Sequence, residues 1–217
     1  MSSGKVLWAS ELCIDCDACI KTCTHHATPK TQEMSAEEVF QLVSSYQPFI
    51  RGVTVSGGEC SLWPEFVREL FELCHEAGLT TLMDSNGMAD FSSMPELMDA
   101  CDGVMLDVKA WDKQLHQQLT GVSNEQVKAN LVWLQHAHKL EELRVVVVEG
   151  WNDPETIIEQ SAAALKDSCA TARIKLIRFR NFGVRGVLEH ASSPSDERMD
   201  ELARLARGCG FGEVVVS

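Results

Sequence analysis

Four cysteines near the start of the sequence have the spacing of ligands to an iron–sulfur cluster. Cys13, Cys16, Cys19 and Cys23 form the run C-x-x-C-x-x-C-x-x-x-C. Thiolates spaced in this way along a loop can turn onto neighbouring irons of one cluster. The spacing therefore predicts that these four cysteines bind a 4Fe–4S cluster.

The same cysteines could instead form a structural zinc site, because pairs spaced C-x-x-C also bind zinc. His25 and His26 could then supply nitrogen ligands. The three-residue step before the last cysteine, and apolar Ile14 and Ile20 beside the loop, favour an iron–sulfur cluster of the bacterial ferredoxin type. Thr24 departs from that pattern, which has proline at this place. In two-cluster ferredoxins the fourth cysteine ligates the other cluster, so a single run predicts a ferredoxin-like half-module.

Polar or glycine residues also gather directly after four apolar runs. They are residues 56–59 (Ser-Gly-Gly-Glu), 84–87 (Asp-Ser-Asn-Gly), 107–109 (Asp-Val-Lys) and 149–150 (Glu-Gly). A glycine pair or an Asn-Gly dipeptide is also a common turn sequence, so each group alone carries little weight. An aspartate or lysine at the end of a buried strand is more informative, because burying its charge is costly unless the charge is paired or used.

The elements that would carry these groups follow from the apolar pattern. Ser35, with Glu37 and Glu38 after it, is predicted to cap a helix that runs to about residue 47. Strand-like runs lie at 52–56, 79–84, 103–109, 143–148, 174–179 and 213–216, and helix-like periods at 65–77, 125–138, 154–167 and 196–207. This alternation predicts a parallel α/β sheet, either a barrel or a doubly wound fold. Because the carboxyl ends of parallel strands meet at one edge, the polar groups predict a ligand site there.

The composition limits the class of protein. The chain has 217 residues, of which 45% are hydrophobic, and a formal charge of −13. We expect no nucleic-acid partner, because no basic stripe could neutralise phosphates. We expect no membrane partner either, because no apolar run approaches the about 20 residues of a membrane span. Nine cysteines without a paired framework, and no secretory leader, favour the cytoplasm.

Six segments, taken in order, resemble those of the glycyl-radical-enzyme activases of the radical S-adenosylmethionine superfamily. Pyruvate formate-lyase activating enzyme is the best-known type. The segments are residues 13–23, 34–39, 52–59, 84–87, 105–109 and 144–150. The resemblance implies a partial (β/α)6 TIM-type barrel over residues 35–217 that lacks its first strand, after a ferredoxin-type segment at 1–34. The residue run 52–56 should then lie at an unpaired edge of the sheet.

The resemblance also assigns residues to S-adenosylmethionine. Gly57, Gly58 and Glu59 match the motif that receives the methionyl amino group, and a glycine turn would let main-chain carbonyls approach it. Asp107 and Lys109 match the pair beside the methionyl end, where a lysine suits the carboxylate.

Further positions follow from the same resemblance. Asp84, Ser85 and Asn86 match the segment near the nucleoside. Arg144 matches a strand arginine that lines the same site. In the pyruvate formate-lyase activase, a monovalent cation is also held at the positions that match Asp84, Ser85, Met105 and Asp107.

The activity implied by the resemblance is the reductive cleavage of S-adenosylmethionine, followed by hydrogen abstraction from a glycine of a partner glycyl radical enzyme. Reduced flavodoxin or ferredoxin would supply electrons. The cysteine run would hold an auxiliary cluster, and its spacing leaves open whether that cluster relays electrons or only holds the loop.

Three departures from the family bear on this activity. The C-x-x-x-C-x-x-C loop of the catalytic cluster is absent, since the run from Cys19 would need a cysteine where His26 stands. Cys60 stands where the family often has proline, and Arg180 where relatives carry a histidine. We therefore assign no catalytic residue and expect a truncated chain that is inactive alone.

Three other functions remain open at this point. A ferredoxin-like electron carrier would explain the cysteines but nothing after residue 35. A barrel aldolase could use Lys109 as a Schiff-base amine. A catalytically inactive remnant could act as an iron–sulfur or ligand-binding protein.

Overall fold

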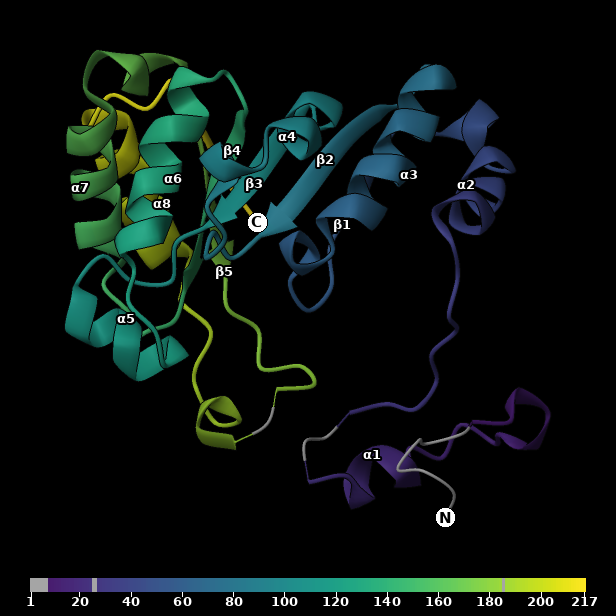
Figure 1. Cartoon of the computed structure of the whole chain (residues 1–217). Helices are drawn as coiled ribbons and strands as arrows, with labels where there is room; N and C mark the ends of the chain where they lie inside the picture. Colours follow the sequence, from purple (N-terminus) through teal and green to yellow (C-terminus); the bar gives the residue numbers. More distant parts are fainter. Residues whose placement is uncertain (1–7, 25–26, 185) are drawn as a thin grey trace.

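Six parallel strands form one sheet, and their order in the sheet is their order in the sequence (Figure 1). The computed structural model that shows this sheet describes residues 8–24, 27–184 and 186–217. The strands are β1 (Gly52–Val55), β2 (Thr80–Ser85), β3 (Gly103–Asp107), β4 (Leu140–Val147), β5 (Arg173–Arg178) and β6 (Glu213–Val216). Every neighbouring pair is parallel, which confirms the predicted α/β fold. β1 has a neighbour on one side only in the described part, as predicted for this edge.

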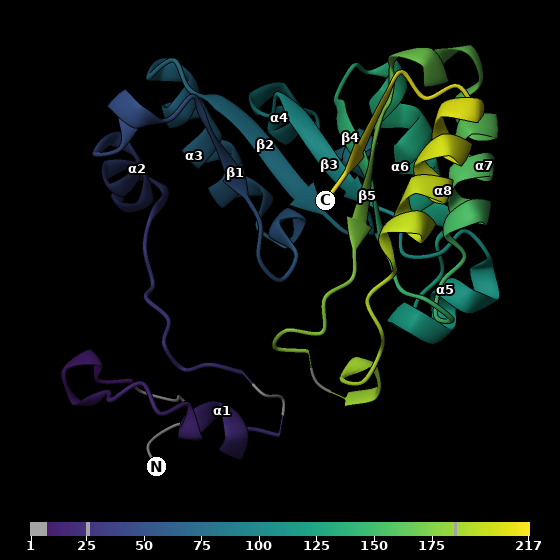
Figure 2. The ribbon, with the colours of Figure 1, turned by 180° about the vertical axis from the view of Figure 1, so that it is seen from behind.

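Helices connect the strands (Figure 1, Figure 2). They are α2 (Ala36–Ser44), α3 (Pro64–Glu76), α4 (Pro95–Ala100), α5 (Lys113–Thr120), α6 (Glu125–His136), α7 (Pro154–Leu165) and α8 (Asp196–Gly208). Short 3-10 helices include η2 (Gln47–Phe49), η3 (Cys60–Leu62), η4 (Phe91–Ser93), η5 (Lys166–Thr171) and η6 (Gly186–Leu188). None of the helices in the described ranges has the length and apolarity that crossing a bilayer requires.

The start of α2 follows from its sequence, but its end was predicted too late. Ser35 and Glu38 form a capping box, in which each side chain accepts a hydrogen bond from the other's backbone N–H. The helix ends at Ser44 rather than near residue 47. The hydroxyls of Ser44 and Ser45 donate to the carbonyls of the preceding turn, which competes with continuation of the helix.

Among the helices that connect the strands, α4 and α5 were not predicted. α5 contains only two apolar residues, Leu115 and Leu119, which are too few to show a repeated apolar period. Its start is instead fixed by Asp112, whose carboxylate accepts a hydrogen bond from the Leu115 N–H at 2.8 Å. It ends at Gly121, which has a left-handed φ of 82°. Capping residues therefore define this helix rather than a buried stripe.

The two faces of the sheet differ in chemistry. On one face, side chains such as Met83, Leu106 and Val145 are fully buried and form a core with helix residues such as Phe71 and Leu131. On the other face, the alternate residues of the same strands include the charged side chains of Asp84, Asp107 and Arg144, which stand next to apolar ones such as Met105. Since successive side chains of a strand point to opposite faces, the fold sets a polar surface directly behind an apolar core.

The cysteine segment, residues 8–24 and 27–34, lies apart from the sheet, on the side where the loops after β1 and β5 end (Figure 1, Figure 2). It contains η1 (Ser10–Leu12) and α1 (Ala18–Thr22), neither of which buries a residue. Lys30 Nζ ties it together by ion pairs to Asp15 (2.7 Å) and Asp17 (3.4 Å). His25 and His26, the candidate zinc ligands, lie outside the described residues.

Candidate functional site

The loop after β1 is bound to the end of β2 by one carboxylate. Glu59 Oε1 accepts hydrogen bonds from the Ser85 hydroxyl (2.8 Å) and from the Ser61 hydroxyl (2.6 Å) and N–H (3.2 Å). Its Oε2 accepts one from the Asn86 N–H at 2.8 Å. Glu59 was predicted to receive an amino group of a ligand, but most of its acceptor capacity is used to hold these two loops together.

Gly57 and Gly58 leave the main chain open beside this carboxylate. Both have positive φ, at 93° and 50°, and no atom lies within 4 Å of the place where a Cβ would stand on either. Such backbone suits glycine and lets another molecule approach the main chain closely. The acceptors open to a ligand's ammonium group here are therefore main-chain carbonyls.

A row of ion pairs crosses the open face of β2, β3 and β4. Arg144 Nη1 lies 2.7 Å from Asp84 Oδ2, and Arg144 Nε lies 4.0 Å from Asp107 Oδ1. Lys109 Nζ lies 2.5 Å from the other oxygen of Asp107. The strand register sets this row, because Arg144 pairs directly with Asp107 across β3 and β4. We call Glu59, Asp84, Asp107, Lys109 and Arg144 the polar rim.

Arg144 is held in its charged form. Burial opposes its charge, but the hydrogen bond and charge attraction from Asp84 outweigh burial and raise the pKa of the guanidinium. Its Nε is buried and makes no hydrogen bond to the described residues. That atom is a buried donor available to a ligand or a bound water.

Two further charged residues on the same face, Glu142 and Lys175, were missed. Glu142, with a side chain only 7% exposed, lies 3.5 Å from Arg144 Nε and 3.7 Å from Lys175 Nζ. The signal was present in the sequence, since Glu142 and Arg144 stand two positions apart on one strand and so share a face. This acid and this base extend the polar rim, and the acid is buried.

Cys60 and Arg180, the two departures from the family pattern, differ in setting. Cys60 is buried, and its thiol donates to the main-chain oxygen of Asp84 at 3.4 Å. Burial, helped by the charge of Glu59, raises the pKa of the Cys60 thiol to about 11. Cys60 therefore acts as a small packing residue between two loops. Arg180 is exposed.

A pocket of about 270 Å³ adjoins the polar rim at the ends of β3, β4 and β5. Its walls are mostly apolar, and Lys109 belongs to both the pocket and the rim. It is lined by Lys109, Leu119, Thr120, Val146, Val148, Trp151, Asn152, Phe179 and Leu188. An apolar pocket beside a charged row can take a ligand with one flat apolar end and one zwitterionic end.

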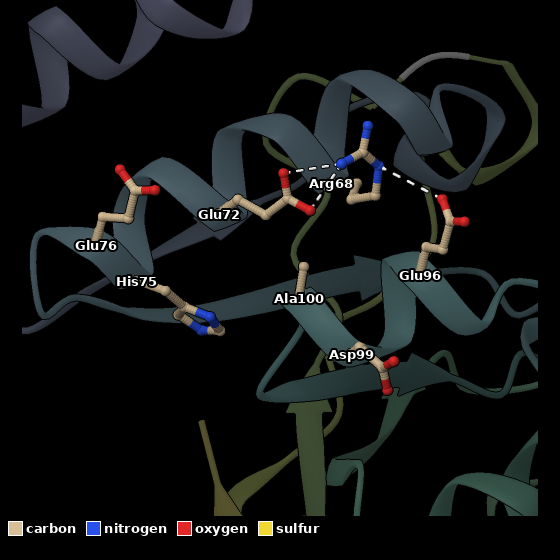
Figure 3. Close-up of a pocket in the computed structure, with 7 residues that line it drawn as sticks. All are labelled: Arg68, Glu72, His75, Glu76, Glu96, Asp99 and Ala100. Atoms are coloured by element: carbon tan, nitrogen blue, oxygen red, sulfur yellow. Dashed lines mark hydrogen bonds and ion pairs between the residues drawn. The ribbon is translucent and has the colours of Figure 1, made fainter.

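A wider groove of about 700 Å³ lies elsewhere, between α3 and α4 (Figure 3). Four carboxylates line it, with Arg68 and His75. Arg68 Nη1 contacts Glu72 at 2.7 Å and Arg68 Nε lies 3.9 Å from Glu96. None of the predicted site residues lines this groove, and the Glu72 and Glu96 side chains are largely exposed, as on a solvated helix surface.

The cysteine run is gathered only in part. Cys19 and Cys23 line a hollow of about 530 Å³ beside α1, whereas Cys13 and Cys16 do not. Within residues 8–24, 27–184 and 186–217, no three Cys, His, Asp or Glu side chains lie close enough together to hold a metal ion. The assignment of a cluster to Cys13, Cys16, Cys19 and Cys23 thus stays a prediction from spacing.

Two further predictions, a monovalent cation and a Schiff-base lysine, concern the polar rim. The position expected for a monovalent cation, at Asp84, Ser85, Met105 and Asp107, is bordered by the Arg144 guanidinium, which contacts both carboxylates; this cation stays a prediction. Lys109 is ion-paired with Asp107. A Schiff-base lysine must present a free amine, so this pairing disfavours the aldolase alternative.

The sequence model of the radical SAM superfamily matches residues 14–159 of the chain. Pyruvate formate-lyase 1-activating enzyme of Escherichia coli (strain K12) is 32% identical over 158 residues, which cover 70% of this chain and 64% of that enzyme. A putative glycyl-radical enzyme activating enzyme of Haemophilus influenzae is 29% identical over 210 residues, covering 87% of this chain and 80% of that protein.

Among solved structures, a domain of pyruvate-formate lyase-activating enzyme from Bacteroides vulgatus superposes with a TM-score of 0.63 at 24% identity. The match covers 76% of this chain and 98% of that domain, and it supports the fold. The chain spans less than two thirds of the length of the Escherichia coli relative.

Proposed function

Because the chain belongs to the radical SAM superfamily, we propose that it takes part in activating a glycyl radical enzyme by binding S-adenosylmethionine at the polar rim. The cofactors of this superfamily are S-adenosylmethionine and a 4Fe–4S cluster. The observation that carries the proposal is the convergence of charged side chains from β2, β3 and β4 beside an apolar pocket. The similar proteins named as activating enzymes support the choice of reaction.

The rim suits the methionyl end of S-adenosylmethionine in charge. The carboxylate of the ligand would pair with Lys109, which stands at the open end of the ion-pair row. Its ammonium would be accepted by main-chain carbonyls at Gly57 and Gly58, where the backbone is exposed. The sulfonium would lie near Asp107, so that the carboxylate and the sulfonium of the ligand each meet an opposite charge, while the ammonium meets neutral acceptors.

The apolar pocket suits the other end of the ligand. Trp151 and Phe179 supply flat rings, and Val146 and Val148 supply aliphatic walls. A purine ring can stack on such walls, while Asn152 and Thr120 offer polar groups for its edge. We place the adenine ring in this pocket.

The chain's own residues position the ligand rather than break its bond. When bound, the 4Fe–4S cluster of the superfamily supplies the electron that cleaves S-adenosylmethionine. The sequence contains no C-x-x-x-C-x-x-C run, and no metal-holding group of three side chains is found among the described residues. These residues do not fit the catalytic cluster, so we derive no step through it.

Further parts of the proposal concern organisation and partners. We propose a ferredoxin-type segment at residues 1–34, whose cluster is auxiliary, and a partial barrel at 35–217 whose β1 edge would pair with a further strand. Reduced flavodoxin or ferredoxin would be the electron donor, and the protein would work in the cytoplasm.

The partner enzyme is proposed to dock on exposed apolar residues around the rim. Leu62 and Trp63 follow the β1 loop, and Phe182 and Val187 follow β5, with exposed fractions of 70% or more. We propose that these residues form one apolar patch, because contiguous exposed apolar patches mark protein interaction sites. Replacing Trp63 and Phe182 by serine should weaken binding to pyruvate formate-lyase, used as the probe, by roughly tenfold. Equal binding of the variant and the unmodified chain would contradict this surface.

The binding proposal is tested by calorimetric titration with S-adenosylmethionine. We expect saturable but weak binding, because the iron that chelates the methionyl group is not supplied by the rim. Lys109→Met should weaken this binding by roughly tenfold or more. Lys113→Met is the matched control, since Lys113 is ion-paired with Glu125 but lies outside the rim. Equal effects of the two substitutions would reject the rim as the binding site.

A further inference from the structure

The β2 loop, residues 86–90, carries part of the polar rim's support and is held from two sides. On the rim side, Ser85 and the Asn86 N–H donate to Glu59. The Gly87 N–H donates to the Ser85 hydroxyl at 3.0 Å, which closes a tight turn. The loop therefore sets where the Glu59 carboxylate and the glycine turn beside it stand.

The other side of the loop is held by one amide on α6. Asn130 Nδ2 donates to the carbonyl of Gly87 (2.8 Å) and to that of Ala89 (2.6 Å). Its Oδ1 accepts from the Phe91 N–H (3.4 Å) and from Gln126 Nε2 (3.3 Å). Asn130 is only 1% exposed, so both amide hydrogens and the amide oxygen are satisfied inside the protein.

The backbone of the loop is closely constrained at Gly87. Gly87 has a φ of 71°, and a Cβ there would stand 2.5 Å from the Leu106 side chain. The backbone thus passes close to β3 in a left-handed conformation that non-glycine residues rarely adopt. Met88 and Ala89 pack against the core, but Gly87 has no side chain, so the two hydrogen bonds from Asn130 fix the position of the turn's carbonyls on this side.

We infer that Asn130 is a positioning residue, which holds the β2 loop so that Ser85 and Asn86 can orient Glu59 and the glycine turn for the ligand. The ligand part of this inference rests on the proposed function; the positioning part rests on the contacts alone. Asn130 does not touch the rim, and acts through the loop.

The test combines amide hydrogen exchange with S-adenosylmethionine titration. In Asn130→Ala, the Asn86 and Gly87 amides, which face away from Asn130, should exchange at least roughly tenfold faster than in the unmodified chain. Asn130→Asp keeps the shape and the acceptor but loses both donors, so it should behave in the same way. Either variant should weaken S-adenosylmethionine binding by roughly tenfold.

Gln135→Ala is the matched control. Gln135 lies on the same helix, is buried, and donates to the Ser168 carbonyl and the Thr171 hydroxyl near the opposite edge of the sheet. It should lower the unfolding temperature without changing exchange at Asn86 or Gly87.

The outcomes separate the two proposals. Unchanged exchange at Asn86 and Gly87 in both Asn130 variants overturns the inference, even if the unmodified chain binds S-adenosylmethionine. Faster exchange in these variants supports the positioning role, whether or not the unmodified chain binds S-adenosylmethionine. If the unmodified chain does not bind it, only the proposed function is rejected. Faster exchange with undiminished binding overturns the link between loop and ligand.

Discussion

The cysteine segment and the polar rim both carry residues that suit a cofactor, but the fold supports them differently. The turns of the cysteine segment, η1 and α1, bury no side chain, and only two of its four cysteines line a common hollow. The rim stands on strands whose alternate residues are fully buried. Strands thus place Asp84, Asp107 and Arg144 side by side without a ligand. The cysteine segment would gain its final shape from the metal, as small metal sites often do.

The largest effect is expected from removing one thiol of the cysteine run, which tests whether this segment binds a cluster independently of the sheet. Cys16→Ser should abolish most iron and sulfide loading after anaerobic reconstitution, because the cluster would lose one of its proposed ligands. The urea unfolding of the sheet should not change, since this segment buries nothing. Cys209→Ser, outside the run, should load as the unmodified chain does. Iron loading by Cys16→Ser, or tight zinc binding in place of iron, would contradict the assignment.

The reactivity of the thiols sharpens the same contrast. Burial raises the pKa of Cys60 to about 11 and that of Cys101 to about 12. The thiolate is the reactive form, so at pH 8 only about one Cys60 thiol in a thousand can react. Exposed Cys16 and Cys19 should be alkylated by iodoacetamide at least about a hundredfold faster, as followed by peptide mass spectrometry.

The rate of Cys60 alkylation should increase with pH. Between pH 7 and pH 9 the Cys60 rate should rise about tenfold per pH unit, because its thiolate fraction grows below the raised pKa. Fast alkylation of Cys60 at pH 7 would show that the β1 loop is not packed against β2 as described.

Removal of Arg144 tests whether the rim is built into the fold. Arg144→Met leaves Asp84, Asp107 and Glu142 without their shared cation, and we expect the free energy of unfolding to fall by about 2 kcal/mol. Arg173→Met removes an arginine that is also paired with two glutamates but is more exposed, and should cost at most about 1 kcal/mol. Urea unfolding midpoints measure both. A loss for Arg144→Met no larger than that for Arg173→Met would mean that the rim is an ordinary surface network.

The strands and most of the rim could be predicted from the sequence, because a buried parallel strand appears as an apolar run and the rim residues follow such runs directly. The sequence could not predict that the Glu59 carboxylate would join two loops by hydrogen bonds, because this depends on how Ser61, Ser85 and Asn86 fold around it. The contact of Asn130 with the β2 loop joins residues more than 40 positions apart, and no spacing rule gives such a pair. The helix α5 was missed because capping, rather than an apolar period, defines it.

The most direct test of the account is hydrogen exchange of the whole chain with and without S-adenosylmethionine. We predict slower exchange in the presence of the ligand at residues 56–60, 84–88, 107–110 and 146–152, which surround the rim and its apolar pocket. The cysteine segment and the groove between α3 and α4 should be unchanged. Protection confined to either of those two regions, or no protection at saturating ligand, would contradict the claim that the polar rim binds S-adenosylmethionine.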